Sequence, residues 1–238
     1  MDDAGNTALV IGASGGLGAA MVEQLKATGE YSQVLGLSRR VAADDAPLLD
    51  VTMESSIAAA AAWVQTKCLV QPLRLVMVAT GLLHHNGQGP ERSLAQLDTI
   101  YLQQVMAINA IGPALLLKHF APLLPREGDT KLIFISAKVG SIGDNALGGW
   151  YGYRASKAAL NQIVKTASIE LVRRNKRICC VAMHPGTVHT ALSEPFAKTG
   201  LNVRPAAYAA VEILSVVRDL SPTNNGTFVD YQGALLPW

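Results

Sequence analysis

Short apolar runs alternate along the chain with longer segments in which apolar residues recur every three or four positions. The short runs predict buried strands, and the longer segments predict helices with one buried face. The predicted strands are residues 7–11, 33–37, 73–79, 131–136, 177–183 and 227–230. The predicted helices are residues 16–28, 53–67, 94–124, 150–175 and 205–220. This alternation predicts an α/β fold in which a doubly wound parallel sheet carries helices on both faces.

No linker or repeat interrupts the pattern, so we expect one domain over residues 1–238. Gly112 and Pro113 are expected to bend the long helix at 94–124. In open sheets of this kind, ligands bind beyond the carboxyl ends of the strands. The informative residues should therefore follow each strand.

Composition argues against several kinds of partner. Half of the residues are hydrophobic and 16% are charged, against about 25% in an average globular protein; strands buried on both faces or an oligomer interface would explain this. The net charge is +2 with both signs interspersed and 5% of residues are aromatic, so no nucleic-acid partner is expected. Cys68, Cys179 and Cys180 form no CxxC pair, which argues against disulfides or zinc and favours the cytoplasm. The sequence shows no signal peptide and no unbroken apolar run of about 18 residues, so no membrane partner is expected.

A glycine cluster follows the first predicted strand, with Gly12, Gly15, Gly16 and Gly18 inside Gly-Ala-Ser-Gly-Gly-Leu-Gly. Glycine permits a tight turn and a close approach of the backbone to a ligand. The helix that follows offers unpaired N–H groups and the positive end of its dipole to a pyrophosphate. Its position between a first strand and a first helix favours a dinucleotide site; the alternative is a plain strand–helix turn.

The second predicted strand is followed by Ser38, Arg39 and Arg40. Sites for NAD usually place a carboxylate here to accept hydrogen bonds from the adenosine ribose, whereas an arginine accommodates a 2′-phosphate. Ser38 stands at the carboxylate position, and the Arg39 guanidinium suits a phosphate. We therefore predict NADP(H) in preference to NAD(H). The alternative is that both arginines only solubilise the end of the strand.

Tyr153 and Lys157 lie four residues apart in a helical pattern, so they share a face. Free tyrosine has a pKa of about 10, and a nearby ammonium is expected to lower it. The pair is suited to give a proton to a carbonyl oxygen while a hydride arrives at the carbon. This spacing alone is common on exposed helices, but its position downstream of the glycine cluster favours a catalytic role.

The spacing of Gly12, Gly16 and Gly18, together with Tyr153-Arg-Ala-Ser-Lys157, resembles the short-chain dehydrogenase/reductase family. The resemblance extends from residue 7 to about residue 233 and implies a Rossmann fold. The short chain and the stretch Ile-Ser-Ala-Lys-Val-Gly-Ser-Ile-Gly are similar to C-factor and sniffer-type carbonyl reductases.

The same resemblance implies which residues hold the cofactor. These are Gly12, Ser14, Gly15, Gly16, Leu17, Gly18, Ser38, Arg39, Asp50, Val51, Ala79, Thr80, Gly81, Tyr153, Lys157, Pro185, Gly186, Val188 and Thr190. Asp50 would contact the adenine amino group; it could equally belong to the N-cap region of the next helix. Ala79 and Thr80 replace the usual Asn and Ala of the family.

The resemblance assigns catalytic roles to Tyr153, Lys157, Asn109 and a serine. The backbone of Asn109 is expected to hold a water that links the lysine to solvent, although a helix kink next to Pro113 could explain this residue too. The serine position aligned from Gly140 falls on Ala137. Ser136 is therefore the candidate that orients the substrate carbonyl, with Ser141 as the substitute. If neither serine reaches the carbonyl, catalysis should be weak.

The resulting hypothesis is an NADPH-dependent oxidoreductase that reversibly reduces a small carbonyl compound to an alcohol. The alternative is an NADP-binding regulatory or signalling protein with little turnover. Residues 187–204 are expected to cover the substrate, and a homodimer or homotetramer is expected from the family. The histidines His84, His85, His184 and His189 are not spaced with carboxylates for a metal, so no metal is expected.

Overall fold

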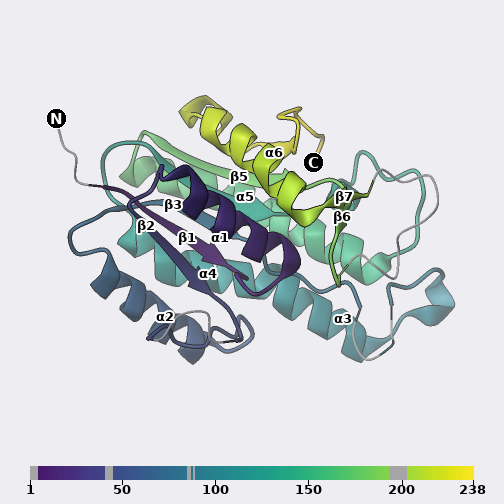
Figure 1. The fold of residues 1–238 in the computed structure, drawn as a ribbon. Coiled ribbons are helices and arrows are strands. Elements are labelled where there is room, and N and C mark those ends of the chain that lie inside the picture. Colours follow the sequence, from purple (N-terminus) through teal and green to yellow (C-terminus); the bar gives the residue numbers. More distant parts are fainter. Residues whose placement is uncertain (1–4, 41–44, 85–86, 88, 193–202) are drawn as a thin grey trace.

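The computed structural model describes residues 5–40, 45–84, 87, 89–192 and 203–238, and it has the predicted α/β architecture (Figure 1). Six parallel strands form one sheet in the order β2-β1-β3-β4-β5-β8. The strands are β1 (Thr7–Ile11), β2 (Gln33–Leu37), β3 (Leu73–Val78), β4 (Thr130–Ile135), β5 (Ile178–His184) and β8 (Phe228–Asp230). Each predicted strand is confirmed to within one residue at both ends.

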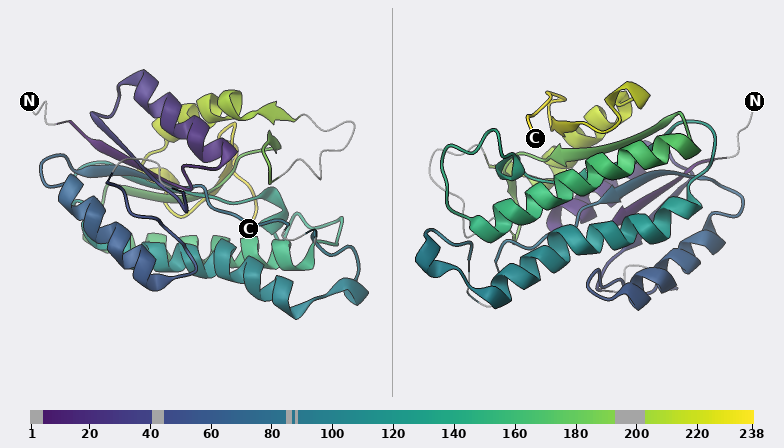
Figure 2. Two further views of the ribbon diagram at one scale, coloured as in Figure 1. Left: turned by 60° about the horizontal axis from the view of Figure 1, so that its bottom comes forward. Right: turned by 180° about the vertical axis from the view of Figure 1, so that it is seen from behind.

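Helices cover both faces of this sheet (Figures 1 and 2). One face carries α1 (Gly16–Thr28) and α6 (Ala206–Asp219). The other face carries α2 (Glu54–Lys67), α3 (Thr99–Met106), α4 (Gly112–Phe120) and α5 (Tyr151–Arg174). Short helical turns are η1 (Leu94–Gln96), η3 (Ala121–Leu123), η4 (Lys138–Gly140) and η6 (Pro222–Asn224). Seen from behind, α5 runs beside the α3–α4 segment (Figure 2, right).

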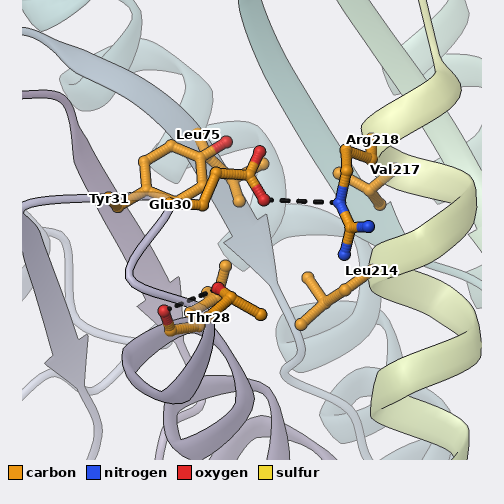
Figure 3. Close-up of a pocket in the computed structure, with 8 residues that line it drawn as sticks. Thr28, Glu30, Tyr31, Leu75, Leu214, Val217 and Arg218 are labelled. Carbon is orange, nitrogen blue, oxygen red and sulfur yellow. Dashed lines mark hydrogen bonds and ion pairs between the residues drawn. The ribbon is translucent and has the colours of Figure 1, made fainter.

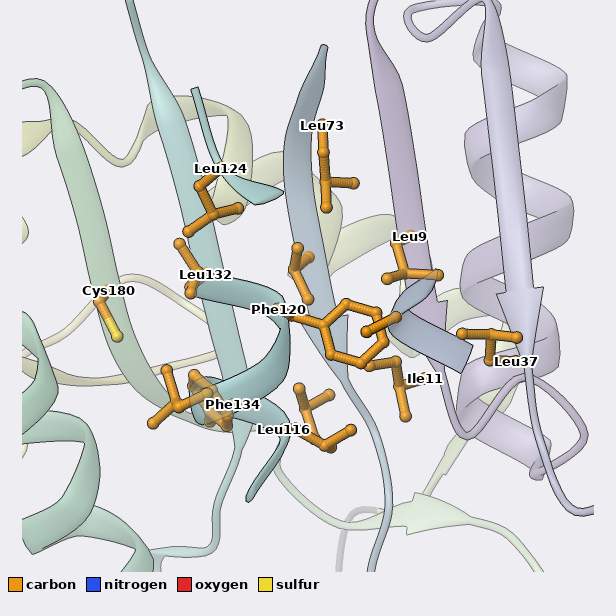
Figure 4. Packing of buried hydrophobic residues seen from close by; sticks show 14 of the residues in the cluster. Leu9, Ile11, Leu37, Leu73, Leu116, Phe120, Leu124, Leu132, Phe134 and Cys180 are labelled. Atoms are coloured by element: carbon orange, nitrogen blue, oxygen red, sulfur yellow. The ribbon is translucent and has the colours of Figure 1, made fainter. Parts of the chain in front are cut away.

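The strands are apolar on both faces because each face is covered. Leu9 and Ile11 of β1 belong to the core layer under α2, α4 and α5, whereas Ala8 and Val10 belong to the layer under α1 and α6. Figure 4 shows Phe120 of α4 lying over the strands of the first layer. Burying a side chain such as Leu9 stabilises the fold by about 1.5–3 kcal/mol.

The predicted helix at 94–124 is interrupted by a five-residue π-helical turn, η2 (Ala107–Ile111). The irregularity therefore lies just before Gly112 and Pro113, where the bend was expected. Pro113 has no N–H to donate to the carbonyl of Asn109, four residues earlier, and π-turns are a known cause of helix kinks. Asn109 lies inside this turn and is fully buried.

One stretch of the described chain, Thr99–Leu123, is long and apolar enough to cross a membrane, with a mean hydropathy of 1.5. In the fold, α3 and η2 pack on α5, and α4 packs on α2 and α5. These contacts give the stretch the position of a core helix.

The carboxyl ends of the strands form the edge of the sheet where a ligand is expected. β1 lies between β2 and β3, so the chain crosses over in opposite directions on the two sides of β1. Such a reversal opens a crevice beyond the carboxyl ends of the strands. Gly12, Ser38, Ala79, Ser136 and Pro185 each follow a strand directly at this edge.

Two short strands that the sequence pattern did not predict lie beside the crevice. β6 (Val188–His189) and β7 (Arg204–Pro205) pair in parallel and join the two ends of the segment expected to cover the substrate. Residues 193–202 of that segment lie outside the described residues.

A small cavity lies near the opposite edge of the sheet, between α1 and α6 (Figure 3). It is lined by Leu25, Thr28, Glu30, Tyr31, Leu75, Leu214, Val217 and Arg218. The Glu30 carboxylate and the Arg218 guanidinium form an ion pair of 3.4 Å beside it. Because the cavity adjoins the C-terminal ends of both helices, it lies away from the crevice and is not part of the candidate site.

Candidate active site

The glycine turn is packed so closely that side chains would not fit at two of its positions. Gly12 has a φ of +94°, and a Cβ there would lie 2.9 Å from the carbonyl carbon and oxygen of Ala79. A Cβ on Gly18 would overlap the Gly12 carbonyl, 2.8 Å from its carbon. The first turn of α1 therefore rests directly on the end of β1, as the predicted phosphate-binding turn requires.

The N-terminus of α1 faces the crevice. Its N-cap residue is Gly15, which has no side chain that could cap the first N–H groups of the helix. Ser14, Gly15 and Gly16 are exposed, whereas Leu17 and Gly18 are buried. A Cβ on Gly16 would come within 3.0 Å of the Thr190 side chain, so the segment after β5 lies against this turn. Exposed glycine backbone at a helix N-terminus fits the pyrophosphate of a dinucleotide.

The residues after β2 place an arginine at the surface. The Ser38 hydroxyl is buried and donates to the carbonyl of Arg40 at 2.5 Å, while the Arg40 N–H donates to the Ser38 hydroxyl at 3.2 Å. Ser38 therefore shapes its own turn. Arg39 is exposed, so its guanidinium is accessible to a phosphate.

Asp50 takes part in the turn that leads into α2. Its carboxylate accepts hydrogen bonds from the backbone N–H and the hydroxyl of Thr52, at 2.9 and 2.6 Å. These bonds, with a smaller contribution from the charge of Arg39, lower the pKa of Asp50. Val51 is buried, and a Cβ on Gly112 would come within 2.9 Å of it. The N-cap of α2 is Met53, and the Asp50 carboxylate shapes the turn just before it; the contact of Asp50 with adenine stays a prediction.

Tyr153 and Lys157 are both buried on α5, with 7% and 3% of their surfaces exposed. The Lys157 ammonium donates to the carbonyl of Ile135 at 2.9 Å and lies 5.9 Å from the centre of the Tyr153 ring. Burial lowers the pKa of Lys157 to about 8. Burial also raises the pKa of Tyr153, with a further contribution from Tyr101. The expected lowering of the tyrosine pKa is therefore wrong for the protein alone, because desolvation by burial dominates.

The Asn109 side chain joins the loop after β3 to the catalytic helix. Its Oδ1 accepts from the Leu82 N–H at 2.7 Å, and its Nδ2 donates to the Leu82 carbonyl at 2.9 Å and to the Ser156 hydroxyl at 3.0 Å. Ser156 in turn donates to the Tyr153 carbonyl at 2.8 Å. The sequence indicated a role for the Asn109 backbone; the structure adds this role for its side chain.

The three residues after β3 connect the glycine turn to Lys157. The Ala79 N–H donates to the Ile11 carbonyl at 2.8 Å. The Thr80 hydroxyl oxygen is buried and has no hydrogen-bond partner among the described residues. A Cβ on Gly81 would lie 3.8 Å from the Lys157 ammonium. The predicted cofactor residues of β1 and β3 and the predicted catalytic lysine are therefore brought together.

Neither candidate serine directs its hydroxyl proton into the site. Ser136 donates to Oδ1 of Asn161 on α5, at 2.6 Å. Ser141 donates to the carbonyl of Trp238, at 3.2 Å. A hydroxyl has one proton, so both donors are already used. These bonds argue against the expectation that Ser136 or Ser141 orients the carbonyl, and Ala137 has no donor in its side chain.

A buried glutamate holds the N-terminus of α5. Glu91 is 2% exposed, and its carboxylate accepts from the Gly152 N–H at 3.1 and 3.3 Å. Its backbone carbonyl accepts from the N–H of Trp150 at 2.5 Å, and Trp150 has a left-handed φ of 54°. The Arg154 guanidinium donates to three carbonyls of the preceding loops. Sequence reasoning missed Glu91, since nothing near residue 91 marks its distant partner.

A buried arginine holds the turn after β5. Arg204 is 5% exposed, stacks 3.5 Å above the Tyr231 ring, and hydrogen-bonds to the Glu212 carboxylate and the Pro185 carbonyl. A side chain on Gly186 would overlap the Arg204 guanidinium. Arg204 therefore fixes the Pro185–Gly186 turn, which is predicted to hold the nicotinamide amide. Nothing in the sequence indicated this role.

Among the described residues, no three His, Cys, Asp or Glu side chains gather as a metal site would require. His85 lies outside that part of the chain. The Nε2 of His84 lies 2.9 Å from the Ala191 carbonyl, which ties the loop after β3 to the start of the predicted substrate cover.

Known proteins resemble this chain in sequence and in fold. Residues 6–200 match the family described as short chain dehydrogenase. The chain is 30% identical over 240 residues to the 1-hydroxy-2-glutathionyl-2-methyl-3-butene dehydrogenase of Rhodococcus sp. strain AD45, covering 98% of this chain and 100% of that protein. It is 34% identical to the C-signal of Myxococcus xanthus over 146 residues, 61% of this chain and 84% of that protein. The NADPH-bound carbonyl reductase from chicken fatty liver superposes with a TM-score of 0.84 at 26% identity, covering 98% of this chain and 94% of that one.

Proposed function

This chain belongs to the short-chain dehydrogenase/reductase family, in a carbonyl reductase-like subgroup, and from that membership we propose that it is an NADPH-dependent carbonyl reductase that also oxidises the corresponding alcohol. The observation that carries the proposal is the buried Tyr153–Lys157 pair at the crevice opened by the glycine turn. A buried phenol next to a buried amine is better suited to proton transfer than to the role of an ordinary surface pair.

The residues divide the reduction between them. When bound, the nicotinamide supplies the hydride that adds to the carbonyl carbon. Tyr153 gives its hydroxyl proton to the carbonyl oxygen, which completes the alcohol. The raised pKa of Tyr153 keeps that proton in place before the step. Lys157, with a pKa of about 8, carries a positive charge at neutral pH and stabilises the phenolate that is left.

The glycine turn would hold the pyrophosphate, and the residues after β2 would select the nucleotide. Ser38 offers no carboxylate to a ribose, and Arg39 is exposed next to it. A 2′-phosphate suits an exposed guanidinium. The structural relative from chicken fatty liver is described as NADPH-bound, which supports the choice of NADPH. We expect a lower Kd for NADPH than for NADH by fluorescence titration; a clear preference for NADH would contradict the choice.

The activity is tested by NADPH consumption. We expect the purified chain to oxidise NADPH with members of a panel of small aldehydes, ketones and quinones, and the alcohol product to be detectable by chromatography. An enzyme that binds NADPH but turns over no member of the panel would contradict a carbonyl reductase.

A second function, an NADP-binding regulator with little turnover, is favoured by one observation. Ser136 and Ser141 both direct their hydroxyl protons elsewhere, and Ala137 stands at the family's serine position. The similarity to a protein named C-signal is consistent with such a role. This alternative predicts tight NADPH binding, no turnover across the panel and a specific protein partner in pull-down experiments.

We further propose a homo-oligomeric assembly and a cytoplasmic location. Ile100, Ile111 and Ile169 are exposed on the α3–α4 segment and α5, which would suit a homodimer or homotetramer. Light scattering in solution tests this, because one chain has a mass of 25.2 kDa. Cys179 and Cys180 are buried free thiols, which suits the reducing cytoplasm.

A further inference from the structure

The last residue of β5 is a half-buried histidine, one ring nitrogen of which is buried and unsatisfied. His184 comes directly before the Pro185–Gly186 turn, and its Nδ1 is buried without a hydrogen-bond partner in the described part of the chain. An unpaired buried polar atom costs about 1–3 kcal/mol. Such atoms are rare in folded proteins and usually mark a position where water or a ligand completes the bond.

Strand register places His184 beside Ser136 on the catalytic face of the sheet. In the parallel pair β4–β5, Ile135 is opposite Met183, and the Ser136 N–H donates to the Met183 carbonyl at 2.7 Å. Continued by one residue beyond β4, this register sets Ser136 opposite His184. Because side chains alternate between faces, His184 points to the same face as Ala182, which lies in the core layer under α5. On this side, the Lys157 ammonium of α5 reaches the Ile135 carbonyl at the end of β4, and Tyr153 lies one turn away on the same helix.

The ring is neutral in the working range of pH. Burial lowers the pKa of His184 to about 4. Among the charged groups around it, Lys138 and Arg204 also lower this pKa, whereas Asp230 and Asp144 raise it. A neutral imidazole has one N–H donor and one acceptor nitrogen.

The site needs such a donor. A carbonyl that accepts a hydride develops negative charge on its oxygen, and one preorganised hydrogen bond to that oxygen accelerates acyl-transfer enzymes by about 10²–10³-fold. The Ser136 hydroxyl donates its hydrogen bond to Asn161, and the Ser141 hydroxyl donates to the Trp238 carbonyl. The Ala137 side chain has no donor. His184 is next to Ser136 and has a polar atom without a partner.

We propose that His184 is a catalytic residue that donates its ring N–H to the carbonyl oxygen of the substrate, in the role that a serine hydroxyl fills elsewhere in the family. The proton stays on the ring throughout, and the proton that is transferred comes from Tyr153. This inference rests on the proposed carbonyl reductase activity.

The test uses 4-nitrobenzaldehyde as the probe carbonyl and four variants of the full chain. His184→Leu keeps volume without a donor, and we expect kcat to fall about 100-fold, with the Kd for NADPH changed less than twofold. His184→Asn retains an N–H near the Nδ1 position and should recover about a tenth of wild-type turnover or more. Ser136→Ala should change kcat less than about threefold. His189→Ala, an exposed histidine on β6, is the matched control and should change neither value.

The inference would be overturned if His184→Leu kept at least half of the wild-type kcat. It would also be overturned if kcat fell about 100-fold in Ser136→Ala. Either result would leave the reductase activity of the wild type intact. If the wild type itself does not reduce the probe, the proposed function fails for this substrate, and a binding measurement decides the inference. In protein labelled with ¹⁵N-histidine and saturated with NADP⁺, 4-nitrobenzyl alcohol should then shift the ring signals of His184 and leave those of His189 unchanged. Unchanged His184 signals at saturating alcohol would refute it.

Discussion

The Glu91 carboxylate accepts the backbone N–H of Gly152 through both oxygens, at 3.1 and 3.3 Å. Gly152 directly precedes Tyr153, so a residue of the loop after β3 fixes the start of the catalytic helix. A Cβ on Gly152 would lie 3.0 Å from a Glu91 carboxylate oxygen, which shows how close the two segments are. The carboxylate also stands where a helix dipole favours negative charge.

Removing this anchor should weaken catalysis more than cofactor binding. We expect Glu91→Ala to lower kcat about 10–100-fold, because a misplacement of about 1 Å can cost about 100-fold. The free energy of unfolding should fall by about 1–2 kcal/mol, as for other lost helix caps. Steady-state kinetics and thermal unfolding measure these effects. Glu127→Ala, at an exposed glutamate, is the control; equal losses in both variants would argue against a positioning role.

The glycine turn should reject even one methyl group. Gly18→Ala would place a Cβ against the Gly12 carbonyl, and relieving such overpacking costs about 1–3 kcal/mol. We expect a lower melting temperature and no measurable NADPH binding by fluorescence. Gly143→Ala is the matched control, since its Cβ would meet no atom closer than 3.5 Å. Normal NADPH affinity in Gly18→Ala would contradict the predicted pyrophosphate site.

Reduction should weaken as pH rises through about 8. Burial sets the pKa of Lys157 at about 8, so the ammonium that stabilises the Tyr153 phenolate is lost above that pH. We expect a falling limb near pH 8 in kcat/KM for NADPH, which reports the free enzyme. Lys157→Arg should be slower but free of this limb, because a guanidinium keeps its proton. If the falling limb near pH 8 persists in Lys157→Arg, or disappears in the control Lys165→Arg, the limb belongs to a group other than Lys157.

Arg39 should distinguish the two nicotinamide cofactors. A hydrogen bond to a charged group contributes about 1.5–3 kcal/mol, so Arg39→Ala should weaken NADPH binding about 10–100-fold and leave the Kd for NADH within about twofold. Arg40→Ala removes the neighbouring exposed charge and serves as the control. Parallel losses for both cofactors would mean that Arg39 does not contact the 2′-phosphate.

The sequence predicted what depends on local pattern and missed what depends on contacts between distant residues. The bounds of β1, β2 and α1 agree with the prediction because apolar runs and flanking glycines mark them directly. The π-turn around Asn109 was not predicted, since its hydrogen-bonding pattern does not follow from apolar periodicity. The direction of the Ser136 hydroxyl depends on Asn161, twenty-five residues later. Glu91 and Arg204 were missed for the same reason, because a lone charged residue gives no sign of being buried.

The central claim is that Tyr153 is the proton donor. The most direct measurement compares Tyr153→Phe with wild type for NADPH consumption with a reactive aldehyde, alongside the Kd for NADPH. We expect kcat to fall by about 10²–10⁴-fold, the usual contribution of a general acid, while the Kd stays within about twofold. Tyr151→Phe, two residues away on the exposed side of α5, should keep wild-type turnover. A Tyr153→Phe enzyme with full activity would contradict the mechanism.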